Sequence, residues 1–174
     1  MGKMSPPIFK PGLGQKGEKR VFNKLYNSTP DNFIILHSLQ LRKHIKQLQG
    51  EIDFIVLAPD YGIFIFEVKG GEWKVENGQW TSYLGSQKRL SKKTPFVQAE
   101  DNKFSVVNSI NKKFPEMRNI LTSWGVVLPH ITIPKELFEM DGEEWRVWDS
   151  TLINNDIFEL IFTPNSTFKS IPYD

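Results

Sequence analysis

Two apolar runs joined by a tight turn constrain the fold of this chain more than any other feature. The runs cover residues 52–58 and 62–68, and the sequence Pro59-Asp60-Tyr61-Gly62 at their junction has the composition of a turn. Both runs are rich in Ile, Val and Phe, as buried β-strands are. The pattern predicts a β-hairpin whose two strands lie in the core.

Three charged residues interrupt this apolar hairpin. Asp53 lies in the first run, Glu67 lies near the end of the second, and Lys69 follows it. Side chains alternate along a strand, so Glu67 and Lys69 share one face. A turn centred on Asp60 places Asp53 opposite Glu67, whereas a turn one residue longer would send Asp53 to the other face. The prediction of a shared site therefore depends on the register.

Two opposed carboxylates repel each other, and burying a charge is costly unless it is paired or binds a metal. Hard cations such as Mg²⁺ take oxygen ligands, often one or two carboxylates together with waters and substrate phosphate. Lys69 would then lie near the metal-bound water and the scissile phosphate, where an ammonium can stabilise developing charge. The three residues together predict a catalytic metal site; the alternative is a set of ordinary charges at an exposed strand end.

The remaining segments predict an α/β fold. The Asn77-Gly78 pair predicts a second hairpin, because both positions tolerate a positive φ. Thr94 is a suitable N-cap for a helix that begins at Pro95. The expected order begins with a helix over 15–27, a strand over 33–36 and the two hairpins. A helix over 95–114 and a strand over 124–133 follow. A strand pair around 135–153 and a short helix over 155–162 come last. This order predicts a mixed α/β sandwich around one central sheet.

The bulk composition is that of one globular domain. The chain has 174 residues, of which 39% are apolar and 13% aromatic, so it can form a real core. The net charge of +2 gives no global basic field, so a nucleic-acid function must rest on local patches and on a site. The absence of cysteine excludes disulfides, thiolate zinc sites and cysteine nucleophiles.

No apolar run approaches the roughly 20 residues of a membrane span, and the N-terminus lacks the apolar core of a signal peptide. We therefore expect a cytoplasmic protein with no membrane partner.

Asp53 and the triplet Glu67-Val68-Lys69 resemble the PD-(D/E)xK nuclease signature. The surroundings of these residues resemble the nuclease-related domain family, NERD, over roughly residues 14–125. The resemblance is carried by Gly17-Glu18, Gly50-Glu51-Ile52-Asp53, residues 61–69 with Gly70-Gly71, Asn77-Gly78-Gln79-Trp80, and Pro95 with Gln98. Phe54 departs from the pattern, because many relatives have His there, and this puts an accessory polar contact in doubt.

The resemblance implies a restriction-endonuclease-like core, in which a central mixed β-sheet is flanked by helices in the order α-β-β-β-α-β. It implies a nuclease core over residues 14–133, with residues 1–13 as an N-terminal arm. Residues 134–174 would form a C-terminal extension packed on the core, and whether they lead to a further domain stays open.

By matching position, the resemblance also implies the roles of individual residues. Asp53, Glu67, Glu18 and the backbone carbonyl of Val68 would hold Mg²⁺ or Mn²⁺. Lys69 would be the catalytic lysine and Gln98 a supporting polar residue. For Glu18, compensation of the helix dipole in the first turn is the competing explanation. Glu51 is a further candidate acid, and Gln98 could instead face solvent.

The implied activity is metal-dependent endonuclease cleavage of DNA in repair, processing or defence, in which a metal-bound water attacks the phosphorus. RNA is not excluded as a substrate. The alternative is a catalytically weak nucleic-acid-binding module that targets a fused or partner helicase. Many nucleases of this fold act as dimers, so a homodimer stays open.

A basic segment before the second helix is the candidate for nucleic-acid binding. We read it as a loop that contacts a backbone phosphate, with nearby aromatic rings for a base, although charged loops are often only solvated. The residues are Lys88, Arg89, Lys92 and Lys93, and the rings belong to Trp73, Trp80 and Tyr83. The second helix is expected to have a mainly apolar side with Val97, Phe104, Val107 and Asn111, and a polar side with Gln98, Asp101, Asn102, Ser105 and Ser109. No ligand spacing links His37, His44 and His130, and we assign them no catalytic role.

Overall fold

The computed structural model describes residues 2–9, 16–41, 50–76, 79–84, 86–91, 93–133, 146–155 and 158. These residues form a six-stranded sheet in the order β1-β2-β3-β4-β8-β9 and a smaller sheet in the order β5-β6-β7. The strands of the larger sheet are β1 (Lys3–Ser5), β2 (Ile34–Leu41), β3 (Gly50–Ala58), β4 (Gly62–Val68), β8 (Thr122–Val127) and β9 (Val147–Trp148). The smaller sheet has β5 (Glu72–Glu76), β6 (Gln79–Leu84) and β7 (Gln87–Leu90), and the helices are α1 (Lys16–Ser28), α2 (Pro95–Lys113) and the short 3₁₀ helix η1 (Pro115–Met117).

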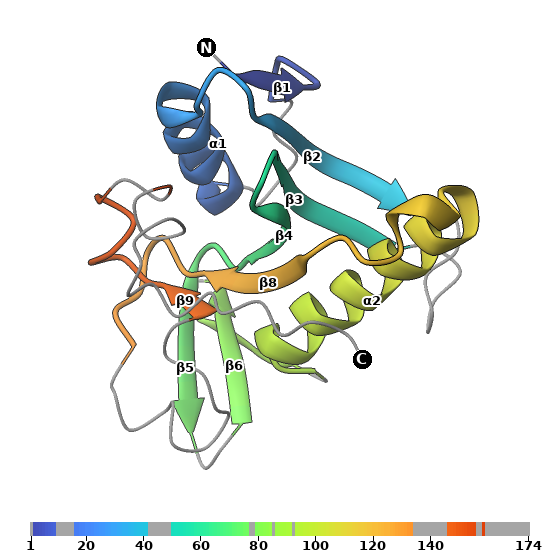
Figure 1. Ribbon diagram of the computed structural model, residues 1–174. Helices are drawn as coiled ribbons and strands as arrows, with labels where there is room; N and C mark the ends of the chain where they lie inside the picture. Colours follow the sequence, from blue (N-terminus) through green and yellow to red (C-terminus); the bar gives the residue numbers. More distant parts are fainter. Residues whose placement is uncertain are drawn as a thin grey trace.

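The two long helices cover opposite faces of the six-stranded sheet (Figure 1). α1 packs Val21 and Leu25 against the side of the sheet that carries Phe54 and Phe66. α2 packs against the other side, where Ile55, Ile63 and Ile65 meet Phe96, Ala99 and Val106. The sheet is mixed, because β2, β3 and β4 are antiparallel while β4 and β8 are parallel. The expected α/β class, consistent with a restriction-endonuclease-like core, is confirmed.

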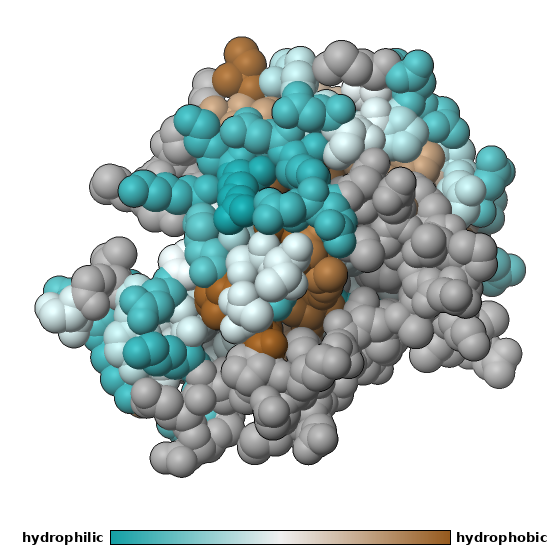
Figure 2. All heavy atoms as spheres, turned by 90° about the vertical axis from the view of Figure 1, so that its left-hand side faces the viewer, coloured by the Kyte–Doolittle hydropathy of each residue, from teal (hydrophilic) through white to brown (hydrophobic). Residues whose placement is uncertain are grey.

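The outer face of α1 is polar and its inner face is apolar, as a helix packed on a sheet requires. The exposed residues include Lys16, Lys19, Arg20 and Asn23. The face of the molecule on the side of α1 accordingly shows a broad hydrophilic surface in Figure 2.

The central hairpin has the predicted register. Leu57 pairs with Ile63 and Ile55 pairs with Ile65, so the turn is centred on Asp60. Asp60 has a φ of 67°, and Gly62 has a φ of 114°. A Cβ on Gly62 would also lie 2.3 Å from the carbonyl oxygen of Leu121, so a side chain cannot be accommodated there.

Two parts of the chain differ from the prediction. Residues 3–5 of the predicted arm form β1, which pairs in parallel with β2 through Met4 and Ile35. Residues 87–90 of the predicted basic loop form β7, the third strand of the smaller sheet. Both strands are too short to carry a recognisable alternation in sequence.

α2 begins and ends close to the predicted residues, but its buried and exposed faces differ from the prediction. Thr94 caps it by accepting a hydrogen bond of 3.2 Å from the backbone N–H of Val97, and Pro95 is its first residue. The side expected to be apolar is partly exposed, at 41% for Val97 and 36% for Phe104. The polar residues Asp101, Asn102 and Ser105 are buried instead. Asn102 donates a hydrogen bond to the buried Glu67, and Asp101 pairs with Lys93, so tertiary contacts satisfy these buried polar groups.

Some predictions fall outside the described residues. They are the Asn77-Gly78 turn, His44, Lys92, most of the predicted 135–153 strand pair and most of the 155–162 helix. Among the described residues, no helix combines the length and the hydropathy needed to cross a membrane.

Candidate active site

Glu67 is the centre of the candidate site. It lies near the end of β4 and is only 6% exposed. Its Oε1 is 2.5 Å from the Nζ of Lys69, and its Oε2 accepts a hydrogen bond of 2.9 Å from the Nδ2 of Asn102 on α2. Both carboxylate oxygens are therefore held, one by the next residue along the same strand face and one by the covering helix.

Asp53 meets β4 beside Glu67. The last paired residues of the β3–β4 ladder are Phe54 and Phe66. Beyond this pair, a side chain of β3 bonds to the backbone of β4: the Oδ2 of Asp53 accepts a hydrogen bond of 2.7 Å from the backbone N–H of Val68. The predicted proximity of Asp53 to the end of β4 is therefore observed, although Asp53 contacts the strand backbone.

The strand alternation breaks at Asp53. Ile52 packs on the α2 side of the sheet together with Ile55, whereas strict alternation would place Ile52 on the α1 side with Phe54. Ser38, which lies between the paired positions on β2, has a φ of 51°. The local distortion of both strands accompanies the turn of the Asp53 side chain toward β4.

Glu18 reaches the same end of the sheet from α1, because the helix begins in close contact with the chain after β4. A Cβ added to Gly17 would lie 2.5 Å from the Cα of Gly70, so this contact requires glycine. The pKa of Glu18 is raised to about 7 by burial and by the charges of Glu51 and Glu67, while Lys69 acts to lower it. The acid of the first helix is therefore within electrostatic range of the hairpin acids.

The pKa of Asp53 is also raised well above its usual value. Burial is the main cause, and the charge of Glu67 adds to it, with a smaller contribution from Glu18. The N–H of Val68 and the ammonium of Lys69 act in the opposite direction. Clustered carboxylates that raise one another's pKa are an arrangement that a cation would stabilise.

The donor set fits a hard divalent cation. Asp53 and Glu67 supply oxygen ligands, and Mg²⁺ commonly binds through one or two carboxylates while water and substrate phosphate complete its shell. Across the described ranges, no three His, Asp or Glu side chains converge into a ready-made metal site. Water and substrate phosphate would therefore have to complete the shell of a cation bound by these two carboxylates.

Asn102 is a site residue that the sequence reasoning missed. The sequence predicts that Asn102 lies on the polar side of the helix, but it indicates Gln98 as the supporting residue. The amide of Gln98 donates a hydrogen bond of 3.3 Å to the carbonyl of Lys93, and Asn102 lies one helical turn further on. The four-residue spacing puts both amides on one face, which was the available signal.

The residues predicted to contact nucleic acid differ in their exposure and in their partners. Lys88 and Arg89 are exposed on β7. The Nζ of Lys93 instead lies 2.9 Å from the Oδ2 of Asp101. Trp80 is buried against Phe96, so its ring belongs to the core and is not an open platform for a base.

Trp73 ties the smaller sheet to the site, because its Nε1 donates a hydrogen bond of 3.0 Å to the carbonyl of Gly70. The backbone N–H of Gly71 donates to the Nδ1 of His130 at 3.3 Å. The turn after Lys69 is thus fixed from two directions.

Comparison with known proteins identifies one family. The chain matches the nuclease-related domain, NERD, over residues 13–128, which include both long helices and the whole candidate site. No curated protein and no solved structure matches the chain.

Proposed function

Because this chain belongs to the NERD family of nuclease-related domains, we propose that it is a divalent-metal-dependent endonuclease that hydrolyses phosphodiester bonds in DNA. The observation that carries the proposal is the arrangement of Glu67. Its carboxylate is held between Lys69 and Asn102, with Asp53 and Glu18 within electrostatic range. Burying several carboxylates near one another is costly unless they are paired or bind a cation.

Asp53 and Glu67 would hold Mg²⁺ or Mn²⁺, with Glu18 assisting. When bound, such a cation supplies Lewis acidity to a phosphate oxygen and lowers the pKa of a coordinated water. The backbone carbonyl of Val68 is a reasonable further ligand. In a strand, the N–H and C=O of one residue point to the same side, and the N–H of Val68 is directed at Asp53.

Lys69 would act on the substrate itself. Its ammonium sits against Glu67, so a phosphate that approaches this carboxylate also approaches the ammonium. A fixed positive charge there stabilises the negative charge that develops on the phosphate oxygens. The same positive charge would help to activate the attacking water by lowering its pKa.

Glu18 would help to hold the water. In the metal-free protein the pKa of its carboxyl group is raised to about 7 by burial and by the neighbouring carboxylates. A bound cation would favour its ionised form, which is the form that can assist as a ligand.

The DNA would be contacted mainly through phosphates. Lys88 and Arg89, which are exposed on β7, and the exposed Lys16 and Lys19 of α1 would supply the positive charge, and phosphate contacts of this kind do not depend on sequence. Lys93 would first have to leave Asp101. RNA as a substrate, a helicase partner and a homodimer remain predictions.

Nicking of a supercoiled plasmid tests the proposal. We expect the protein to relax the plasmid in Mn²⁺ or Mg²⁺ and not in EDTA, and we expect Asp53→Ala to abolish this. Glu72→Ala is the matched control, because Glu72 is an exposed acid of β5 whose ion pair with Lys74 lies outside the site. Equal metal-dependent nicking by the parent and Asp53→Ala would overturn the proposal.

One observation favours a second candidate, a module that binds nucleic acid without cutting it. Lys69 is paired with Glu67, and no three ligating side chains converge among the described residues. If this pairing persists, metal binding is weak. Calorimetric titration with Mn²⁺ separates the two candidates: salt-sensitive DNA binding without Mn²⁺ binding supports the module, whereas Mn²⁺ binding that is lost in Asp53→Ala supports the nuclease.

A further inference from the structure

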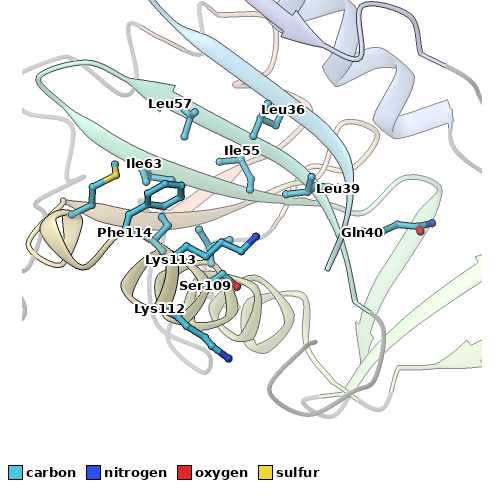
Figure 3. Close-up of a pocket in the computed structure, with 13 residues that line it drawn as sticks. Leu36, Leu39, Gln40, Ile55, Leu57, Ile63, Ser109, Lys112, Lys113 and Phe114 are labelled. Atoms are coloured by element: carbon cyan, nitrogen blue, oxygen red, sulfur yellow. The ribbon is translucent and has the colours of Figure 1, made fainter. Parts of the chain in front are cut away.

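A second surface feature lies away from the candidate site, on the α2 side of the sheet. It is a cleft of about 950 Å³ between β2, β3 and β4 on one side and the C-terminal half of α2 with η1 on the other (Figure 3). Ile63 lines it at the start of β4, at the opposite end of that strand from Glu67. The cleft is therefore a separate surface that the proposed chemistry does not use.

The walls of the cleft are apolar. Leu36, Ile55 and Ile63 line it from the sheet, and Val106 and Ile110 line it from α2. Ser109 also lines it, but its hydroxyl donates a hydrogen bond of 2.8 Å to the carbonyl of Ser105 on its own helix. The interior thus offers apolar contact and little directed polar recognition.

The charge at the cleft has one sign. Lys112 and Lys113 are the charged residues among the described residues that line it, and both are exposed. Figure 3 shows their side chains extending from the end of α2 beside the apolar walls. The cleft therefore combines an apolar floor with a positively charged edge, and its complement is an apolar surface flanked by acids.

The apolar surface continues beyond the cleft. Phe114 and Met117 line it and yet are 48% and 36% exposed, and Ile120, just past η1, is 36% exposed. A small ligand that filled only the interior would leave these rim residues in water. Their exposure calls for an occupant that is wider than the cleft and covers its rim.

We propose that this cleft docks an amphipathic helix of a partner protein, with apolar side chains in the cleft and acidic side chains against Lys112 and Lys113. A helix is about 10–12 Å across and presents apolar residues at positions i, i+3, i+4 and i+7, which suits an open apolar groove. Acidic flanks would steer the helix toward the lysines and fix its orientation.

A designed peptide is the probe. It is an 18-residue helix with leucines on one face and glutamates on the others, labelled with fluorescein, and its binding to the full chain is followed by fluorescence anisotropy. We expect saturable binding that weakens as salt is raised. A peptide with the same leucines and lysines in place of the glutamates should bind much more weakly, and so should a scrambled peptide of the same composition.

Two variants locate the binding. Phe114→Asp and the double variant Lys112→Glu/Lys113→Glu should each weaken binding by about tenfold or more, because each places negative charge against a helix that carries acids. The matched controls lie on the same helix outside the cleft: Phe104→Asp, at an exposed aromatic residue, and Lys103→Glu, at a lysine that sits over the Phe104 ring. Both controls should bind like the parent, and circular dichroism confirms that all variants are folded.

Several results would overturn the proposal. They are no binding of the glutamate peptide, equal binding of the lysine peptide, or equal weakening by Phe104→Asp. The proposal would also be overturned if the parent self-associates and Phe114→Asp does not, because the occupant of the cleft would then be a second copy of this chain. A lipid would be the occupant if dodecanoate displaced the peptide, if Phe114→Asp weakened dodecanoate binding, and if the glutamate and lysine peptides bound equally well.

Discussion

Glu67 combines burial, charge and two hydrogen-bond partners in one residue. A buried carboxylate is tolerated when its oxygens are satisfied, and here Lys69 and Asn102 satisfy one each. The arrangement fixes the direction of the carboxylate as well as its charge. Asn102 therefore acts on the candidate site by positioning Glu67.

Asn102→Ala should reduce the rate of metal-dependent DNA cleavage by about 10–100-fold, because loss of a residue that orients a ligand has effects of this size. The loss should appear in kcat and in the apparent affinity for Mn²⁺, while the affinity for DNA in EDTA should be unchanged. Asn108→Ala, at an exposed position of the same helix, is the control and should match the parent. A variant of Asn102 with the parent's kcat and Mn²⁺ affinity would contradict the positioning role.

Asp53→Asn should increase the free energy of unfolding at pH 8 in the absence of metal. The pKa of Asp53 is raised above its ordinary value of 3.8 in the folded protein, so ionisation at higher pH costs stability. This loss of stability is absent when the pH is below the pKa of Asp53 in the unfolded chain. It is complete when the pH is above the pKa of Asp53 in the folded protein. Asn keeps an oxygen for the N–H of Val68 and removes the charge.

Urea unfolding at pH 8 measures the change in the free energy of unfolding, which should be an increase for Asp53→Asn relative to the parent. The gain should vanish near pH 3, where the carboxyl group is protonated in both states. Glu100→Gln, at an exposed position on α2, should give no such gain. Destabilisation by Asp53→Asn at pH 8 would show that the charge is already compensated without a cation.

At the scale of elements, the position of α1 depends on the contact between two glycines. Gly17, in the first turn of α1, and Gly70, after β4, approach so closely that either Cβ would meet the Cα of the other residue at 3.0 Å or less. This contact brings Glu18 to the hairpin. The first helix and the second strand of the hairpin are thus joined at the site itself.

Gly17→Ala should destabilise the protein by about 1–3 kcal/mol through overpacking. The sign of this change in the free energy of unfolding distinguishes a tight contact from an open one. Replacing an exposed helical glycine with alanine usually stabilises a protein, by roughly 0.5–1 kcal/mol. Thermal and urea unfolding measure the change, and Asn23→Ala on the exposed face of α1 serves as the control. A more stable Gly17→Ala variant would mean that the contact is looser than the structure has it.

The elements also show what the sequence could predict. The register of β3 and β4 followed from the turn at Asp60 and from the alternation of the apolar residues, and it is confirmed. The start of α2 at Pro95 followed from the Thr94 cap. The buried side of α2 did not, because Asp101, Asn102 and Ser105 are buried through tertiary contacts that no periodicity reveals. For the same reason Gln98 was chosen over Asn102.

At the scale of the whole molecule, the two candidate surfaces lie at opposite ends of β4. The acids and Lys69 gather where α1, the hairpin and α2 meet, while the apolar cleft lies beside the start of β4 and the end of α2. Family membership, the α/β fold and the position of Asp53 next to the end of β4 were accessible from sequence motifs. The cleft was not, because its lining comes from segments far apart in the chain.

The most direct test of the nuclease account is the rate of plasmid nicking in Mn²⁺ by a pair of matched lysine variants, Lys69→Met and Lys74→Met. Lys69 contacts Glu67 at the site, whereas Lys74 is an exposed lysine on β5 that pairs with Glu72. The account predicts that Lys69→Met lowers the rate about 100-fold or more, as removal of a group that stabilises developing charge does, while Lys74→Met stays within about twofold of the parent. Equal rates for the parent and a folded Lys69→Met variant would contradict it.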